Sequence, residues 1–124
     1  MIFGIGTDII EIARVKKALD NPRFIERVYT EAEQAYCNGK GAQRAASYAV
    51  RWAGKEAVMK AFGTGLRNGE MRDIEILPDA LGCPIVHLSG AFASLAAERG
   101  IHSLKVSLSH AHDFATAVCV AEGE

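Results

Sequence analysis

The sequence lacks a large net charge. Fourteen Lys and Arg residues oppose 15 Asp and Glu residues, which gives a formal net charge of -1. Domains that bind nucleic acids or anionic membranes through charge carry an excess of basic residues, so we expect neither partner. Any recognition by charge must therefore depend on local groups of side chains.

Cysteine is scarce, and long apolar runs are absent. Cys37, Cys83 and Cys119 are an odd number of thiols, far apart, with small or apolar neighbours. This pattern is typical of reduced thiols in the cytoplasm, and no pair has the spacing of metal ligands. The amino terminus does not resemble a signal peptide and no segment is long enough to span a membrane, so we expect a cytoplasmic protein.

Two common catalytic motifs are also missing. Ser109 and His110 are adjacent, but a serine nucleophile of the G-x-S-x-G type needs flanking glycines and a histidine brought from elsewhere in the fold. The glycines of Gly63-Thr-Gly65 follow a predicted helix, whereas a P-loop precedes one. The sequence therefore argues against a serine hydrolase and a P-loop protein.

The chain of 124 residues is 49% hydrophobic, which is enough for one domain over residues 1–124. Capping signals at Asn21-Pro22 and at Thr30 with Glu33 predict two helix starts. The expected elements are a strand at 2–7, a helix at 8–20, short helices after Asn21 and Thr30, a long helix at 43–62, a hairpin at 73–88, a helix ending at Gly100, and strands at 104–109 and 114–121. This order predicts an α+β fold, with a mainly antiparallel sheet packed against one long helix and several short ones.

Several positions have ordinary structural explanations. Gly4 and Gly6 mark places in the first strand where another backbone or a ligand comes close. Asp8 has the spacing of a helix-capping residue with Glu11. Three basic residues share one flank of the long helix, where we expect a solvated edge: Arg44, Arg51 and Lys55.

Glu56 and Lys60 are harder to explain by stability. They lie one turn apart on the helix face that also carries Ala49, Trp52 and Met59, so two charges interrupt an apolar stripe. An exposed pair of this kind contributes only about 0.2–0.5 kcal/mol, while removing each ion from water costs several kcal/mol. We therefore expect a solvated cleft that holds a cation or phosphates.

Asp8 and Glu56 together form a possible pair of oxygen ligands for Mg²⁺, which typically uses one or two carboxylates with water and substrate phosphates. Lys60 and the following glycines could contact those phosphates. A local concentration of cations in the first two helices could attract an acidic protein partner; it comprises Arg14, Lys16, Lys17, Arg23 and Arg27.

Three segments in this order and spacing resemble the holo-acyl-carrier-protein synthases, the group-I phosphopantetheinyl transferases. They are GIGTDIIEI at 4–12, RWAGKEAVMKAFGTG at 51–65 and VSLSH at 106–110. The resemblance implies transfer of phosphopantetheine from coenzyme A to a serine of apo-acyl carrier protein, with release of adenosine 3′,5′-bisphosphate. It also implies a homotrimer with coenzyme A bound between subunits.

The resemblance extends to individual residues. It implies Asp8 and Glu56 as Mg²⁺ ligands and Lys60 as a phosphate and catalytic group. Our hypothesis is that Glu56, directly or through a metal-bound water, accepts the serine proton. The further positions implied for coenzyme A are Gly63, Thr64, Gly65, Ser109 and His110, and those implied for the carrier protein are Arg14, Lys17 and Arg23.

Two residues depart from the family pattern. Trp52 and Gly54 stand where phenylalanine and alanine are more usual. The glycine costs about 1 kcal/mol of helix propensity, and could loosen the helix or relieve crowding from the tryptophan.

The alternative function is a noncatalytic coenzyme A or nucleotide-binding module that uses the same cations and glycines.

Overall fold

The protein is described by a computed structural model that covers residues 1–65 and 69–124. The elements are β1 (Ile2–Glu11), α1 (Ile12–Ala18), α2 (Pro22–Val28), α3 (Glu31–Asn38), η1 (Gly41–Gln43), α4 (Arg44–Phe62), η2 (Met71–Asp73), β2 (Ile74–Pro78), β3 (Pro84–Leu88), α5 (Gly90–Arg99), β4 (Ile101–Ala111) and β5 (Phe114–Gly123). The expected α+β fold with an antiparallel sheet and one long helix is confirmed.

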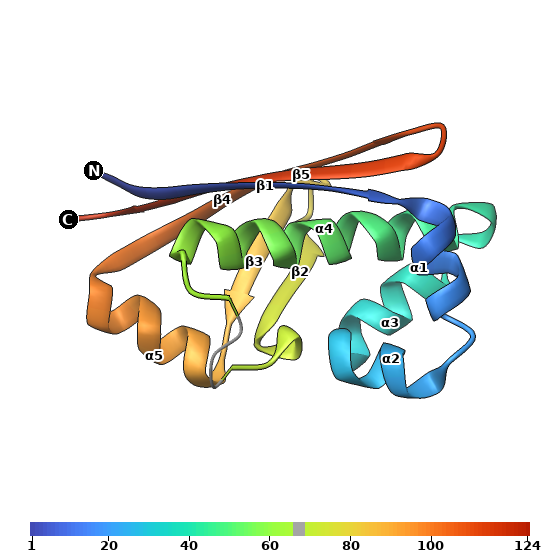
Figure 1. Ribbon diagram of the computed structural model, residues 1–124, viewed down its shortest axis with the longest axis horizontal. Helices are drawn as coiled ribbons and strands as arrows, with labels where there is room; N and C mark the ends of the chain where they lie inside the picture. Colours follow the sequence, from blue (N-terminus) through green and yellow to red (C-terminus); the bar gives the residue numbers. More distant parts are fainter. Residues whose placement is uncertain (66–68) are drawn as a thin grey trace.

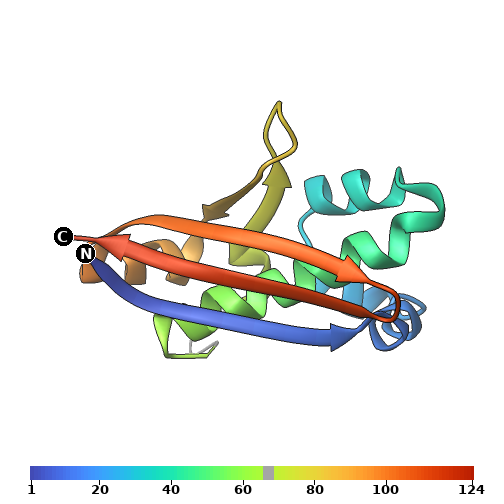
Figure 2. The same ribbon diagram turned by 90° about the horizontal axis from the view of Figure 1, so that it is seen from above.

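The main sheet has three antiparallel strands in the order β1-β5-β4. Helix α4 runs along one face of this sheet, while α1 to α3 gather at one end and α5 at the other (Figure 1). Figure 2 views the sheet from its opposite face, which no helix of the described chain covers. The hairpin of β2 and β3 forms a separate two-stranded sheet.

Helix α4 lies unusually close to the sheet because the facing side chains are small. A Cβ atom added at Gly4 or Gly6 would overlap the backbone carbonyl of Ala61 or Ala57, respectively. The inward positions of β5 are also small and buried: Ala115, Ala117, Cys119 and Ala121. The sequence prediction of a close approach at the two glycines is confirmed, and the approaching group is the backbone of α4.

The helix caps follow the sequence at three places. The Asn21 side chain accepts a hydrogen bond from the Arg23 N–H at 3.0 Å, and Thr30 and Glu33 form a complete capping box. Gly63 ends α4 with a φ of 77°, in the left-handed region that glycine tolerates. These local signals were sufficient because each depends on residues close together in the sequence.

The predicted helix start at Asp8 is wrong. Strand β1 continues to Glu11, and Asp8 pairs with Ala117 of β5. Helix α1 begins at Ile12, and its N-cap residue Glu11 makes no side-chain capping bond. The capping spacing is misleading here because pairing with β5 satisfies the backbone of residues 8–11, so Asp8 is free to face α4.

The predicted solvated edge on α4 is also wrong for two of its three residues. Arg51 and Lys55 are buried, while Arg44 is half-buried beside the ring of Tyr48. Within residues 1–65 and 69–124, strand β2 pairs with β3 alone, and the backbone of its other edge accepts hydrogen bonds from the Arg51 and Lys55 side chains. Among the described residues, no helix combines the length and hydropathy needed to cross a membrane.

The departure at Gly54 has a different cause from the one expected. A Cβ atom at this position would meet the Ile76 Cδ1 at 2.6 Å and the Leu108 Cδ2 at 3.0 Å. The crowding therefore comes from β2 and β4, and Trp52 is not among the nearest groups.

Substituting Gly6→Ala should destabilise the fold by about 1–3 kcal/mol or more, because the added methyl group overlaps a helix carbonyl that cannot move alone. Urea unfolding followed by circular dichroism measures the loss. Gly39→Ala is the matched control, since its new Cβ has no neighbour nearer than 3.5 Å. Equal free energies of unfolding for the two variants would contradict the close packing.

Candidate active site

Asp8, Glu56 and Lys60 meet where β1 crosses α4. Gly4, Gly6 and Asp8 are alternate residues of β1, so the packing of Gly4 and Gly6 on α4 turns Asp8 towards the same helix. The Lys60 Nζ donates to the Asp8 Oδ1 at 3.1 Å and to the Thr7 carbonyl at 3.0 Å. The structure therefore brings Asp8 next to two residues of one helical turn, of which Lys60 is 52 positions away in the sequence.

The electrostatic environment of Glu56 disfavours its ionised form. Burial raises the pKa of Glu56, the negative charge of Asp8 raises it further, and the positive charge of Lys60 lowers it. Lys60 pairs with Asp8 and, in the described structure, makes no ion pair with Glu56. One ammonium thus faces two acidic groups, which leaves an excess of negative charge when both are ionised.

The exposure of this cluster corrects the expected inward placement of its helix residues. The Lys60 side chain is 54% exposed and that of Asp8 is 16% exposed, while Glu56 is half-buried. The fully buried charge on α4 is the neighbouring Lys55. The cluster therefore lies at the boundary between the core and solvent, where a dissolved ligand can reach it.

The donor set fits Mg²⁺ better than a transition metal. Asp8 and Glu56 offer hard carboxylate oxygens, the ligand type that Mg²⁺ prefers, and Mg²⁺ commonly takes its remaining ligands from water and phosphates. A bound cation would offset the negative charge of Asp8, which together with burial raises the pKa of Glu56. No group of three or more His, Cys, Asp or Glu side chains forms a metal site in the described part of the chain.

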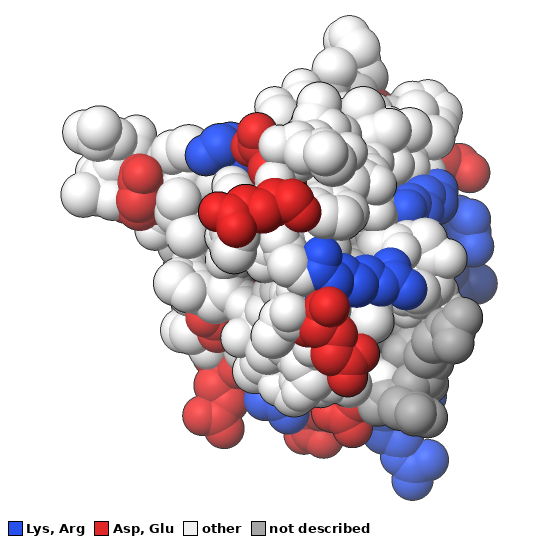
Figure 3. All heavy atoms as spheres, turned by 90° about the vertical axis from the view of Figure 1, so that its left-hand side faces the viewer, with Lys and Arg blue, Asp and Glu red and all other residues white. Residues whose placement is uncertain are grey.

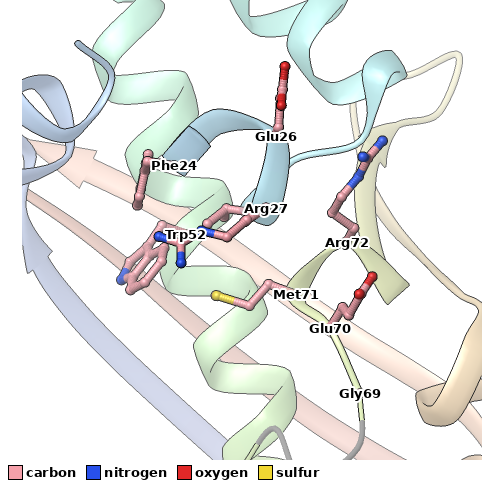
Figure 4. A pocket seen from close by; sticks show the side chains of 9 residues that line it. Phe24, Glu26, Arg27, Trp52, Gly69, Glu70, Met71 and Arg72 are labelled. Carbon is pink, nitrogen blue, oxygen red and sulfur yellow. The ribbon is translucent and has the colours of Figure 1, made fainter. Parts of the chain in front are cut away.

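A cavity of about 460 Å³ opens one turn along α4 from Glu56. The side chains of Trp52, Arg27 and Met71 point towards one another from α4, α2 and η2, whereas Glu26 and Arg72 point away (Figure 4). The ring centroids of Trp52 and Phe24 lie 5.7 Å apart, so these two residues form an aromatic part of the wall. We call this space the Trp52 cavity; Phe24, Glu26, Arg27, Val28, Trp52, Gly69, Glu70, Met71 and Arg72 line it.

Sequence reasoning missed the Trp52 cavity. Trp52 stood out only as an unusual residue within a motif, and Met71 carried no signal at all. The cavity forms because α2 and η2 are brought to the same side of α4 from opposite directions along the chain.

The glycine turn after α4 is a helix cap. The Gly63 N–H donates to the Met59 and Lys60 carbonyls at 3.0 and 3.1 Å, and the Thr64 hydroxyl donates to the Gly65 carbonyl at 3.3 Å. Arg99 adds a cation at the helix end by donating to the Phe62 carbonyl at 2.5 Å. The turn directly follows Lys60, so it borders the cluster. Residues 66–68 lie outside the described part.

Ser109 and His110 are not part of this cluster. They lie on β4, at the sheet edge opposite β1. His110 lines a second hollow, of about 380 Å³, which also contains Lys40 and Arg51. Within one chain, the predicted coenzyme residues therefore divide into two groups on opposite edges of the sheet.

The three residues expected at a carrier-protein surface, Arg14, Lys17 and Arg23, are all exposed on α1 and α2. Arg14 also lines a small hollow of about 160 Å³ that shares Phe24 and Trp52 with the Trp52 cavity. A macromolecule bound to α1 would thus lie next to Trp52.

Elsewhere, acidic and basic side chains alternate on the end of the molecule seen in Figure 3, with no extended field of one sign on that face.

The chain is similar to known proteins over nearly its whole length. A family model described as the 4′-phosphopantetheinyl transferase superfamily matches residues 4–119. A holo-[acyl-carrier-protein] synthase from Geobacter metallireducens is 46% identical over 125 residues, which cover 98% of each chain.

Solved structures agree with this match. The holo-[acyl-carrier-protein] synthase from Neisseria meningitidis has a TM-score of 0.90 and 36% identity, with 98% of this chain and 99% of that chain covered. A Bacillus anthracis holo-(acyl-carrier-protein) synthase in complex with CoA (3′,5′-ADP) has a TM-score of 0.84 and 40% identity, with 100% and 99% covered. The chain thus belongs to the 4′-phosphopantetheinyl transferase superfamily.

Proposed function

We propose that this protein transfers phosphopantetheine from coenzyme A to a serine of an apo-acyl carrier protein and releases adenosine 3′,5′-bisphosphate. The observation that carries the proposal is the meeting of Asp8, Glu56 and Lys60 where β1 crosses α4. Membership of the superfamily and the names of the relatives support it. The nucleophile belongs to the partner, so the chain needs no activated serine or cysteine of its own.

The chemistry follows from the three side chains. The serine oxygen of the carrier forms a bond to the β-phosphorus of coenzyme A, and the bond from that phosphorus to the bridging oxygen breaks. Glu56 is the proposed acceptor of the serine proton. Lys60, exposed and next to Asp8, stabilises negative charge on the phosphates. Asp8 and Glu56 would hold Mg²⁺, which when bound neutralises the pyrophosphate.

The Trp52 cavity is the proposed site of the pantetheine arm. It begins one turn from Glu56, and its volume of about 460 Å³ is typical of a small-molecule pocket. The apolar walls suit the methyl and methylene groups of the arm. With the pyrophosphate at Lys60 and the arm at Trp52, the reacting phosphorus lies between them, close to Glu56.

We infer that the chain assembles as a homotrimer with its sites between subunits. The uncovered face of the sheet exposes Ile5, Ile9 and Val118 at 67%, 62% and 37%, an apolar area that a second copy would cover. The separation of His110 from Asp8 also supports assembly, because contact between unlike edges would bring the two groups together. In that arrangement His110, with Ser109 beside it, would meet coenzyme A held by the neighbouring copy's Lys60 and Gly63–Gly65.

A cytoplasmic location fits the thiols. Cys37, Cys83 and Cys119 are all free, and two of them are buried. Free thiols persist in a reducing compartment, where acyl carrier proteins and coenzyme A would also be available.

The test of the function is mass spectrometry of an apo-acyl carrier protein incubated with coenzyme A and Mg²⁺. We expect the carrier to gain one phosphopantetheine group and a chelator to prevent the gain. Glu56→Gln and Asp8→Asn should each lower kcat by about 100-fold or more, because each removes an interaction at the reacting phosphate.

Glu98→Gln, at an exposed position on α5, is the control and should keep full activity. Binding of coenzyme A without any modification of the carrier would instead support a noncatalytic coenzyme-binding module. Unchanged turnover in either active-site variant would remove that residue from the mechanism.

Val118→Asp should dissociate the assembly, because it places a charge in the apolar area that would be buried between copies. Sedimentation velocity measures the change in mass, and transfer activity should fall with it. Ala91→Asp introduces the same charge at an exposed position in the first turn of α5 and should change neither property. A monomeric, fully active wild-type protein would contradict the proposed assembly.

Arg14→Glu should raise KM for the carrier protein by about tenfold while KM for coenzyme A stays constant, since Arg14 is exposed on α1 and outside the Asp8 cluster. Steady-state kinetics at several salt concentrations provide the measurement. In the wild type, KM for the carrier should increase with salt, and the variant should show a weaker dependence. An equal rise in both KM values would argue against a carrier surface on α1.

A further inference from the structure

At one edge of strand β2, ionised side chains form the backbone hydrogen bonds that a neighbouring strand would otherwise form. In the described part of the chain, β2 pairs with β3 along one edge and with no strand along the other. At its other edge, the Ile74 carbonyl accepts from Lys55, the Ile76 N–H donates to the Glu33 Oε2 at 2.9 Å, and the Ile76 carbonyl accepts from the Arg51 Nε at 3.0 Å. Every one of these backbone groups is buried with its partner.

Lys55 uses all three of its protons in this network. Besides the Ile74 carbonyl, its Nζ donates to the Glu33 Oε1 at 2.8 Å and to the Met71 carbonyl at 3.0 Å. Glu33 also accepts from the Thr30 N–H at 2.9 Å, so its oxygens are satisfied as well. The pair therefore ties the first turn of α3, the middle of α4 and the η2 turn to one another.

Attraction between the two charges alone does not explain this arrangement. Lys55 and Glu33 have no exposed side-chain surface. Replacing a buried ion pair by well-packed apolar residues is often neutral or stabilising, because two ions no longer have to leave water. What an apolar pair cannot do is hold two particular backbone carbonyls at fixed positions, since only a donor with several protons does that.

The carbonyl that matters most belongs to Met71. Its side chain points into the Trp52 cavity (Figure 4), and residues 69–72 form the cavity wall that faces α4. Trp52, Lys55 and Glu56 lie within two turns of the same helix. Helix α4 thus carries three groups with different roles. Trp52 forms one wall of the cavity, Lys55 holds the Met71 carbonyl of the other wall, and Glu56 is the proposed proton acceptor.

We propose that Lys55 and Glu33 are positioning residues for coenzyme A, which hold the wall of residues 69–72 opposite Trp52 and so set the width of the cavity for the pantetheine arm. This inference rests on the proposed function. Neither residue touches the substrate; both act through Met71 and the start of β2. The arm should therefore lose affinity when the pair is broken, while the nucleotide end of coenzyme A should bind as before.

Adenosine 3′,5′-bisphosphate separates these two effects, because it lacks the arm. In Lys55→Met, KM for coenzyme A should rise by about tenfold or more, while the inhibition constant of adenosine 3′,5′-bisphosphate and KM for the carrier protein should each stay within about twofold. Glu33→Gln provides a milder second variant: it keeps an acceptor for Lys55 but turns an amide N–H towards the Ile76 N–H. This variant should raise KM for coenzyme A by a smaller factor.

Ile101→Ala is the control for loss of stability, since Ile101 is buried at the start of β4, away from the cavity. All variants are compared by urea unfolding, and the control should leave KM for coenzyme A unchanged. The positioning role is rejected if the affinity for adenosine 3′,5′-bisphosphate falls as much as the affinity for coenzyme A. It is also rejected if KM for coenzyme A does not change in a folded variant. If neither variant folds, the pair is a determinant of folding and the role is rejected as well. An inactive wild type would instead reject the proposed function.

Discussion

The packing of α4 directly on β1 is the constraint on which the rest of the structure depends. It requires glycine at positions 4 and 6 of the strand, because any side chain there would overlap the helix carbonyls of Ala61 and Ala57. Once the strand is held this close, Asp8 reaches the turn of α4 that carries Glu56 and Lys60. The position of the candidate site is thus a consequence of two residues that have no side chain, Gly4 and Gly6.

The opposite flank of α4 contacts the edge of strand β2. There, Arg51 and Lys55 supply donors to a strand edge that has no neighbouring strand, and Glu33 supplies the matching acceptor. The helix therefore contacts one sheet through minimal side chains and the other through long charged ones. Both contacts are short and directional, which fixes α4 in rotation as well as in position.

Within one chain, the residues proposed for coenzyme A are divided between two edges of the main sheet. His110 lies with Lys40 and Arg51 at the β4 edge, whereas Asp8 lies at the β1 edge. Between these edges, the uncovered face of the sheet exposes the apolar side chains of Ile5, Ile9 and Val118. An assembly that buries this face would also join the two groups of residues, so the same surface would serve stability and binding.

Local signals were readable from the sequence, including the caps at Asn21, Thr30 and Gly63, the α+β order and the family motifs, because each depends on neighbouring residues. Asp8 and Lys55 were misread because their partners are distant: β5 extended the strand past Asp8, and the free edge of β2 buried Lys55. The sequence by itself determined which chemical groups are present and which elements carry them. Only the tertiary structure decided which charges are buried and which cavity they border, since hydrogen-bond partners and solvent exposure depend on segments that meet only after folding.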